Sequence, residues 1–250
     1  MPSICQVIAR NRRHTPLKRP AATASRAGQS VRPGAASHTL AAVRCTTLPQ
    51  ELSRNAFVAQ LDALTAVYLA AMRPDPLQLP GRRSIMERHA TFGEFRALAM
   101  TAGAAGAPES GRPVPPGQII GFCYGFRGAG GQWWHDVVAA ALTARSGRAV
   151  TAAWLSDSLE VAEVHVHPDY HGRGIGRSLV LGLAEGRRER TAVLSTQDAD
   201  SAARRLYRGL GFDDLLTGYS FPGTPVPYAV MGAALPLRPA AARSPSPSRL

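Results

Sequence analysis

The chain has 250 residues and a formal net charge of +12, with 45% apolar and 18% charged residues. This length can bury a sizeable core, and the composition is that of a globular protein. No run of 18 uninterrupted apolar residues occurs, so we expect no membrane-spanning helix. The cysteines Cys5, Cys45 and Cys123 are far apart and form no CxxC pair, so we expect a cytoplasmic protein without disulfides or a metal site.

The positive charge lies mainly at the two ends of the chain. Residues 1–40 hold seven basic and no acidic residues, and residues 238–250 hold three basic and no acidic ones. Residues 41–237 hold 19 basic and 17 acidic residues, whereas a nucleic-acid-binding domain concentrates positive charge on a folded face. Because both ends are also poor in large apolar residues, the sequence predicts a disordered N-terminal extension, a disordered tail and one folded domain over 41–237, with no nucleic-acid partner.

Hydrophobic periodicity predicts alternating strands and helices in the folded part. Phe57, Leu61, Leu64 and Tyr68 recur at spacings of three and four residues, which indicates a helix, and Pro74 follows it. In chain order the expected elements are a short apolar run at 40–43, helices at 53–72 and 84–90, strands at 95–101 and 118–126 around a loop at 103–116, a strand at 159–167, a helix at 174–188, a strand at 191–196, a helix at 201–210 with Asp200 as its N-cap, and strands at 212–216 and 228–235. This order is typical of an α/β protein.

Residues 128–153 interrupt that order as an insertion. A glycine cluster leads into Trp133, Trp134 and His135, and an Ala-rich helical stretch follows to about residue 144. The two tryptophans either cover the surface of the domain or form a lid over a substrate, since long loops often carry specificity.

A strand, a glycine-rich turn and a helix follow one another at residues 159–188. Gly172, Gly174 and Gly176 allow close approach of a ligand to the backbone, and free N–H groups at the start of the helix favour an anion. Arg173 and Arg177 add positive charge, so the turn suits a phosphate or pyrophosphate. The Gly-x-Gly-x-Gly spacing differs from the Rossmann fingerprint, and no lysine follows Gly176 as a P-loop requires.

This segment resembles the acetyl-CoA turn of the GNAT (general N-acetyltransferase) superfamily. The sequence His171-Gly-Arg-Gly-Ile-Gly176 follows Val166-His-Pro168, where the family has Gln/Arg-x-x-Gly-x-Gly/Ala after Val-x-Pro. A second family pattern, Asn-x-x-Ala-x-x-Leu-Tyr and then Gly-Phe, is matched by Asp200 to Tyr207 and by Gly211-Phe212. His171 and Asp200 depart from the usual residues at their positions.

The resemblance implies a GNAT acyl-CoA N-acyltransferase fold, a mixed and mostly antiparallel sheet splayed around the acetyl-CoA site with flanking helices. It further implies an N-acetyltransferase that moves the acetyl group of acetyl-CoA to a primary amine by direct attack, without a metal. The backbone of Val164, His165 and Val166 and the turn are then expected to hold acetyl-CoA, together with Asp200. The turn residues in question are His171, Gly172, Arg173, Gly174, Ile175, Gly176 and Arg177.

The resemblance also implies catalytic roles. Tyr207 matches the family position whose hydroxyl protonates the departing thiolate. Glu160 and Glu163 are the candidate bases, and a water chain or His165 is the remaining alternative. Strand alternation predicts that Glu160, Ala162, Val164 and Val166 share one face and that Glu163, His165 and His167 share the other, unless a bulge changes the face of Glu163.

The acceptor is expected to be a small-molecule or peptide amine, bound in part by Trp133, Trp134 and His135, and the enzyme a monomer or homodimer. The alternative is a GNAT-like protein that binds acyl-CoA as a sensor or structural module without catalysis.

Overall fold

The computed structural model describes residues 48–74, 79–103, 115, 117–224 and 226–238. The apolar run at 40–43, the N-terminal extension and most of the loop at 103–116 and of the tail lie outside the described residues. The strands are β1 (Gln50–Leu52), β2 (Arg96–Thr101), β3 (Ile119–Arg127), β4 (Ser158–Val166), β5 (Thr191–Gln197), β6 (Asp213–Ser220) and β7 (Pro227–Ala234). The helices are α1 (Arg54–Ala59), α2 (Leu61–Met72), α3 (Leu79–His89), α4 (Trp133–Ser146), α5 (Arg148–Leu155), α6 (Ile175–Ala184) and α7 (Ala202–Arg208), and a 3-10 turn spans Pro168–Tyr170.

The strands form one seven-stranded sheet in the order β1-β2-β3-β4-β5-β7-β6. Every neighbouring pair is antiparallel except β4 and β5, which are parallel. That parallel pairing covers only Ser158–Glu160 against Thr191–Val193, so the two strands diverge beyond Glu160. The sheet therefore opens between β4 and β5, as the predicted splayed and mostly antiparallel fold requires.

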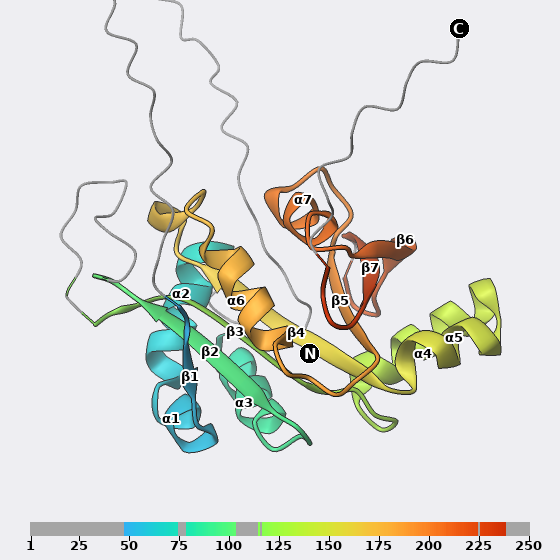
Figure 1. The fold of residues 1–250 in the computed structure, drawn as a ribbon, viewed down its shortest axis with the longest axis horizontal. Coiled ribbons are helices and arrows are strands. Elements are labelled where there is room, and N and C mark those ends of the chain that lie inside the picture. The colour runs from blue at the N-terminus through green and yellow to red at the C-terminus, as the bar shows by residue number, and fades with distance from the viewer. Residues whose placement is uncertain (1–47, 75–78, 104–114, 116, 225, 239–250) are drawn as a thin grey trace, which may run out of the picture.

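Helices cover both faces of the β1–β4 half of the sheet (Figure 1). α6 packs on one face, against β2, β3 and β4, and α2 packs on the other face, against β3 and β4. Among the described residues no helix is long and apolar enough to span a membrane.

The first predicted helix is in fact two helices. Ser53 caps α1 by accepting a hydrogen bond from the backbone N–H of Ala56 at 3.2 Å, as its short polar side chain allows. The chain turns at Gln60 before α2 begins. Arg73 then ends α2 in a left-handed conformation, one residue before Pro74.

A bulge in β4 corrects the predicted facing of its side chains. Tyr124 pairs with Glu163 and Gly125 pairs with Val161, so Ala162 is an extra residue on β4. Val164 and Val166 consequently pack in the cluster on the α6 side, whereas Ala162 packs on the α2 side. The prediction that these three residues share a face was wrong, because the bulge reverses the alternation after Ala162.

The insertion forms two helices where one was expected. α4 runs to Ser146, and α5 begins after Gly147, whose φ of +85° breaks the helical path. The apolar side chains of α4 and α5 cover one face of the β5-β7-β6 half of the sheet. There they pack against Val193, Leu216, Phe221, Tyr228 and Val230.

The N-cap of α7 is Ser201 and not Asp200. The Ser201 hydroxyl accepts from the backbone N–H of Arg204 at 3.2 Å, while the Asp200 carboxylate is exposed and pairs with Arg205 at 2.6 Å. The two residues have similar capping ability, and the arginine one turn ahead draws Asp200 away from the helix end. α7 also ends at Arg208, two residues before the predicted end, and α6 ends at Ala184 rather than near residue 188.

Candidate active site

The divergence of β4 from β5 leaves a free edge on β4. Beyond Glu160, β5 bonds to β7 on its other side, while the described part of β4 has no β5 partner from Val161 to Val166. Backbone N–H and C=O groups along this edge require hydrogen-bond partners. The edge includes Val164, His165 and Val166, so it can bind an extended chain that carries amide groups.

The glycine turn lies directly after this edge and opens α6. Gly172 and Gly174 have φ values of +75° and +81°, which disfavour any side chain, and a Cβ on either would meet no heavy atom within 4 Å. The space above both residues is open, and the N–H groups of the first turn of α6 point out of its N-terminus. Gly176 has another role: a Cβ there would lie 3.2 Å from Leu206, so it allows close packing of α6 on α7.

The basic side chains of the turn are held by the protein itself. The His171 Nε2–H donates to the carbonyl of Val166 at 2.9 Å, which fastens the turn to the end of β4. The Arg173 guanidinium lies 5.1 Å from the ring centre of Tyr170, and Arg177 donates to the carbonyl of Gly209 at 3.3 Å. The backbone of the turn and the charge of Arg173 and Arg177 thus favour an anion, while His171 orders the loop.

Tyr207 lies on the α6 side of the sheet. Its side chain is fully buried in the cluster that holds Ile175, Val164 and Val166. Ala203 and Leu210 belong to the same cluster, as the predicted helical stripe requires.

Glu160 lies on the opposite side of the sheet, in a cavity of about 300 Å³. Its side chain is 3% exposed, and its Oε2 has no hydrogen-bond partner. Burial raises the pKa of Glu160 to about 8. The other residues that line the cavity come from α3 and the segment after it, β3 and the start of the insertion: Ile85, Arg88, His89, Phe92, Phe126, Gly131, Gln132, Trp133 and Trp134.

Glu163 points to the same side as Glu160 but is fully paired. It accepts from Arg82 Nη1 at 2.6 Å and forms a very short contact with His165 Nε2. Burial alone would raise the pKa of Glu163, but the charges of Arg82 and His165 hold it below its ordinary value. Arg82 also lies 4.7 Å from the ring centre of Tyr68.

This ion pair and its neighbours were not anticipated from the sequence. Arg82 is 81 residues from Glu163 and lies in a helix whose pattern shows no buried charge. His89, in the same helix, contacts the Tyr124 hydroxyl through Nδ1 at 3.1 Å, and burial lowers the pKa of His89 to about 4. The chain separation explains why no local signal revealed these contacts.

The three predicted acceptor-binding residues lie in different environments. Trp133 is 40% exposed and lines the cavity, whereas Trp134 is buried and its indole N–H donates to Ser195 Oγ at 3.0 Å. His135 does not line the cavity; its Nε2 contacts the carbonyl of Leu155 at 3.3 Å and thereby joins α4 to the end of α5.

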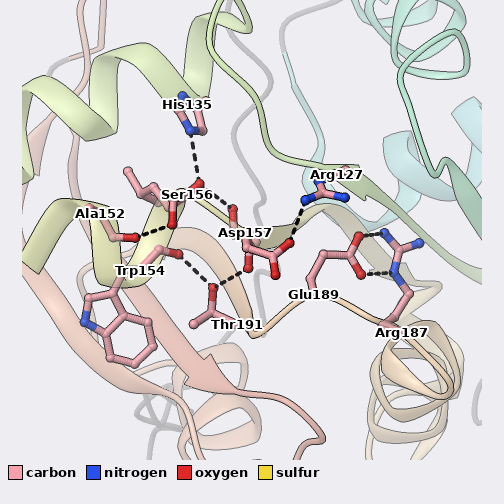
Figure 2. Close-up of polar contacts among 11 residues, drawn as sticks. Arg127, His135, Ala152, Trp154, Ser156, Asp157, Arg187, Glu189 and Thr191 are labelled. Carbon is pink, nitrogen blue, oxygen red and sulfur yellow. Dashed lines mark hydrogen bonds and ion pairs between the residues drawn. The ribbon is translucent and has the colours of Figure 1, made fainter.

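The end of the insertion is anchored to the sheet close to His135 (Figure 2). Thr191 Oγ1 donates to the carbonyl of Trp154 at 2.7 Å, and Arg127 forms an ion pair with Asp157 at 2.9 Å. Asp200, the remaining predicted cofactor contact, is on the surface beside Arg205. Within the described ranges no three His, Cys, Asp or Glu side chains are grouped so that they could hold a metal ion.

Comparison with known proteins decides the family. The sequence model of the acetyltransferase (GNAT) domain matches residues 114–214. A GCN5-like protein acetyltransferase of Mycobacterium tuberculosis is 37% identical over 194 residues, which cover 70% of this chain and 91% of that protein. The chain belongs to the GNAT family of acetyltransferases. The predicted family, fold class and enzyme class are thereby confirmed.

Two solved acetyltransferase structures are also similar to the chain, at low sequence identity. The yncA protein of Salmonella typhimurium, solved with its cofactor acetyl-CoA, is 16% identical, covers 79% of this chain and all of its own, and gives a TM-score of 0.47. The ribosomal-protein-S18-alanine N-acetyltransferase of Escherichia coli is 17% identical, covers 74% of this chain and 92% of its own, and gives 0.46.

Proposed function

We propose that this GNAT protein transfers the acetyl group of acetyl-CoA to a primary amine by direct attack, with Glu160 as general base and Tyr207 as general acid. The observation that carries the proposal is the opening between β4 and β5. The glycine turn and Tyr207 lie on one side of the sheet, and the Glu160 cavity lies on the other side.

The residues on the α6 side fit acetyl-CoA. The open space above Gly172 and Gly174 and the N-terminus of α6 suit a pyrophosphate, with Arg173 and Arg177 as nearby cations. The free edge of β4 over Val164, His165 and Val166 offers backbone hydrogen-bond partners to the amides of the pantetheine arm, in addition to the Val166 carbonyl that already accepts from His171. When bound, acetyl-CoA supplies the activated acetyl group at the opening.

Glu160 is proposed to take the proton from the amine. Its carboxyl has an unpartnered oxygen in a cavity that can hold the acceptor, and burial brings its pKa near the operating range of a general base. Glu163 lacks both features, since Arg82 and His165 occupy its oxygens. We assign Glu163 the structural role of neutralising Arg82.

The proton balance is simple. The amine nitrogen bonds to the acetyl carbon while the carbon–sulfur bond breaks, Glu160 accepts the proton that the amine loses, and the Tyr207 hydroxyl donates a proton to the departing thiolate. The products are an acetamide and the free thiol of CoA. Tyr207 and Glu160 lie on opposite sides of the sheet, so the proposal requires that the reacting atoms meet in the gap between β4 and β5, with one group acting from each side.

Thiol release measured with acetyl-CoA and a broad panel of primary amines tests the proposal. We expect turnover with at least one amine, and a loss of about 10²-fold in kcat for Glu160→Gln with little change in acetyl-CoA affinity. Tight acetyl-CoA binding without turnover of any amine would contradict the proposal and favour a non-catalytic acyl-CoA sensor.

A further inference from the structure

The walls of the Glu160 cavity are largely aromatic. Phe92 and Phe126 meet edge to face with ring centres 4.9 Å apart, and His89 lies 4.9 Å from Phe126. Trp133 and Trp134 close another part of the wall, and Ile85 adds an aliphatic surface. Burial lowers the pKa of His89 to about 4, so this imidazole is neutral at physiological pH and adds no charge. Such a surface binds an apolar ring.

The cavity lining holds a buried carboxyl and an exposed guanidinium. Glu160 is 3% exposed. Arg88, in the last turn of α3, is exposed. No ion pair joins the Arg88 guanidinium to an acidic group in the part of the chain that the structure describes. This cation would repel a simple ammonium ion, but it can bind a carboxylate with two parallel hydrogen bonds.

We propose that the acceptor is a small primary amine that carries both an aromatic ring and a carboxylate, the chemistry of a free aromatic amino acid. The inference rests on the proposed function, because it takes the Glu160 cavity as the acceptor site. The amine reaches Glu160, the ring contacts Phe92, Phe126 and the tryptophans, and the carboxylate binds Arg88. Arg88 is thus a specificity-determining residue.

The size of the cavity agrees with this class of acceptor. A volume of about 300 Å³ lies at the lower end of the range of about 300–1,000 Å³ for small-molecule sites. The N-terminus of a peptide presents an amide where an amino acid has its carboxylate, and a lysine side chain brings neither a ring nor an anion. Neither of them would satisfy both Arg88 and the aromatic wall.

The test compares kcat/KM for L-phenylalanine, phenylalaninamide, 2-phenylethylamine, L-alanine and the peptide Phe-Gly-Gly. We expect phenylalanine to exceed phenylalaninamide and 2-phenylethylamine by at least about tenfold, and alanine by a similar factor. The amine of phenylalaninamide is less basic than that of phenylalanine and is more often deprotonated at neutral pH. A preference for phenylalanine over the amide therefore cannot arise from ionisation of the amine.

Arg88→Gln should lower kcat/KM for phenylalanine about tenfold and bring its ratio to phenylalaninamide close to one. Arg83→Gln is the matched control on the same helix, since Arg83 does not line the cavity and pairs with Asp62 on the surface. It should keep the ratio of the parent enzyme.

The possible failures are distinguishable. Equal turnover of phenylalanine and phenylalaninamide by the parent, or greater turnover of Phe-Gly-Gly, would overturn this inference while leaving acetyl transfer intact. If the enzyme acetylated only amines that are not among these five, this inference would also be overturned and acetyl transfer would again remain intact. Absence of thiol release with these five and with the broad panel, in protein that binds acetyl-CoA, would overturn the proposed function as well.

Discussion

Glu160 and Glu163 are three residues apart on β4, yet their side chains lie on the same face of the sheet, because the bulge at Ala162 separates them. On that face their environments are opposite. Glu160 has an unpartnered oxygen in a cavity, whereas Glu163 is held between Arg82 and His165. We therefore propose the first carboxyl for proton transfer and a structural role for the second, and the two roles can be tested separately.

Glu160→Gln should change the pH dependence of turnover. The base form of Glu160 exists above its pKa of about 8, so roughly one tenth of it is ionised at pH 7. At saturating amine, kcat of the parent should rise with pH and level off above about 8, and the glutamine variant should be about 10²-fold slower without this rise. A variant that keeps the parental profile would exclude Glu160 as the base.

The same substitution should stabilise the fold at high pH. The folded-state pKa of Glu160 lies above its ordinary value, so its contribution to stability is present at low pH and is lost as pH rises through about 8. Glutamine cannot ionise. We therefore expect the Tm of the Glu160→Gln variant at pH 9 to exceed that of the parent by at least about 4 °C. At pH 5 the two melting temperatures should be similar, and a difference of the same size there would contradict burial of the carboxylate as the cause.

Arg82→Gln should be far more destabilising than Arg83→Gln. Arg82 pairs with a buried carboxylate, and its loss leaves the Glu163 charge uncompensated, which costs about 3–5 kcal/mol. Arg83 pairs with an Asp62 side chain that is 92% exposed, and such pairs contribute about 1 kcal/mol or less. Urea denaturation of both variants gives the comparison; equal effects would show that the buried pair does not stabilise the protein.

Gly174→Asp should weaken acetyl-CoA binding at least about tenfold, or about 1.4 kcal/mol, because a carboxylate would occupy the position proposed for pyrophosphate. Gly186→Asp is the matched control. Gly186 also has a positive φ, at +67°, and open space around it, but it lies beyond the other end of α6. Calorimetry should show parental affinity for the control, and similar losses in the two variants would point to backbone strain instead of the binding turn.

Tyr207→Phe should lower kcat about 10²-fold and leave acetyl-CoA affinity little changed, since it removes only the hydroxyl that donates the proton. Tyr228→Phe is a suitable control because Tyr228 is equally buried but packs in the cluster beneath the insertion. Parental turnover by the Tyr207 variant from about pH 6 to 9 would contradict the acid role.

Local sequence patterns predicted most of the fold. The glycine turn before α6 and the alternating strands depend on residues close in sequence, so their positions were correct within a few residues. The Ala162 bulge could not be located, because it arises from the register between β3 and β4. The α7 cap was misassigned since Asp200 and Ser201 are both good capping residues, and only the Arg205 contact separates them.

The candidate site was predicted less completely. The roles of Glu160 and Tyr207 follow from the family resemblance and remain predictions. The pairing of Glu163 with Arg82 depends on helix α3 folding over the sheet, and no spacing in the sequence encodes that contact. The presence of Trp133 and Glu160 in the lining of one cavity likewise depends on how the insertion packs against the sheet.

The short parallel pairing of β4 with β5 has a mechanical consequence. Only three residues of each strand pair across the junction between the two halves of the sheet, so this pairing alone would hold the halves together weakly. The insertion leaves from β3 and returns to β4, yet it is fastened to the other half through Trp134 and Ser195 and through Trp154 and Thr191. It therefore links the two halves of the sheet directly, and we expect it to limit changes in the width of the gap where we propose that the two substrates meet.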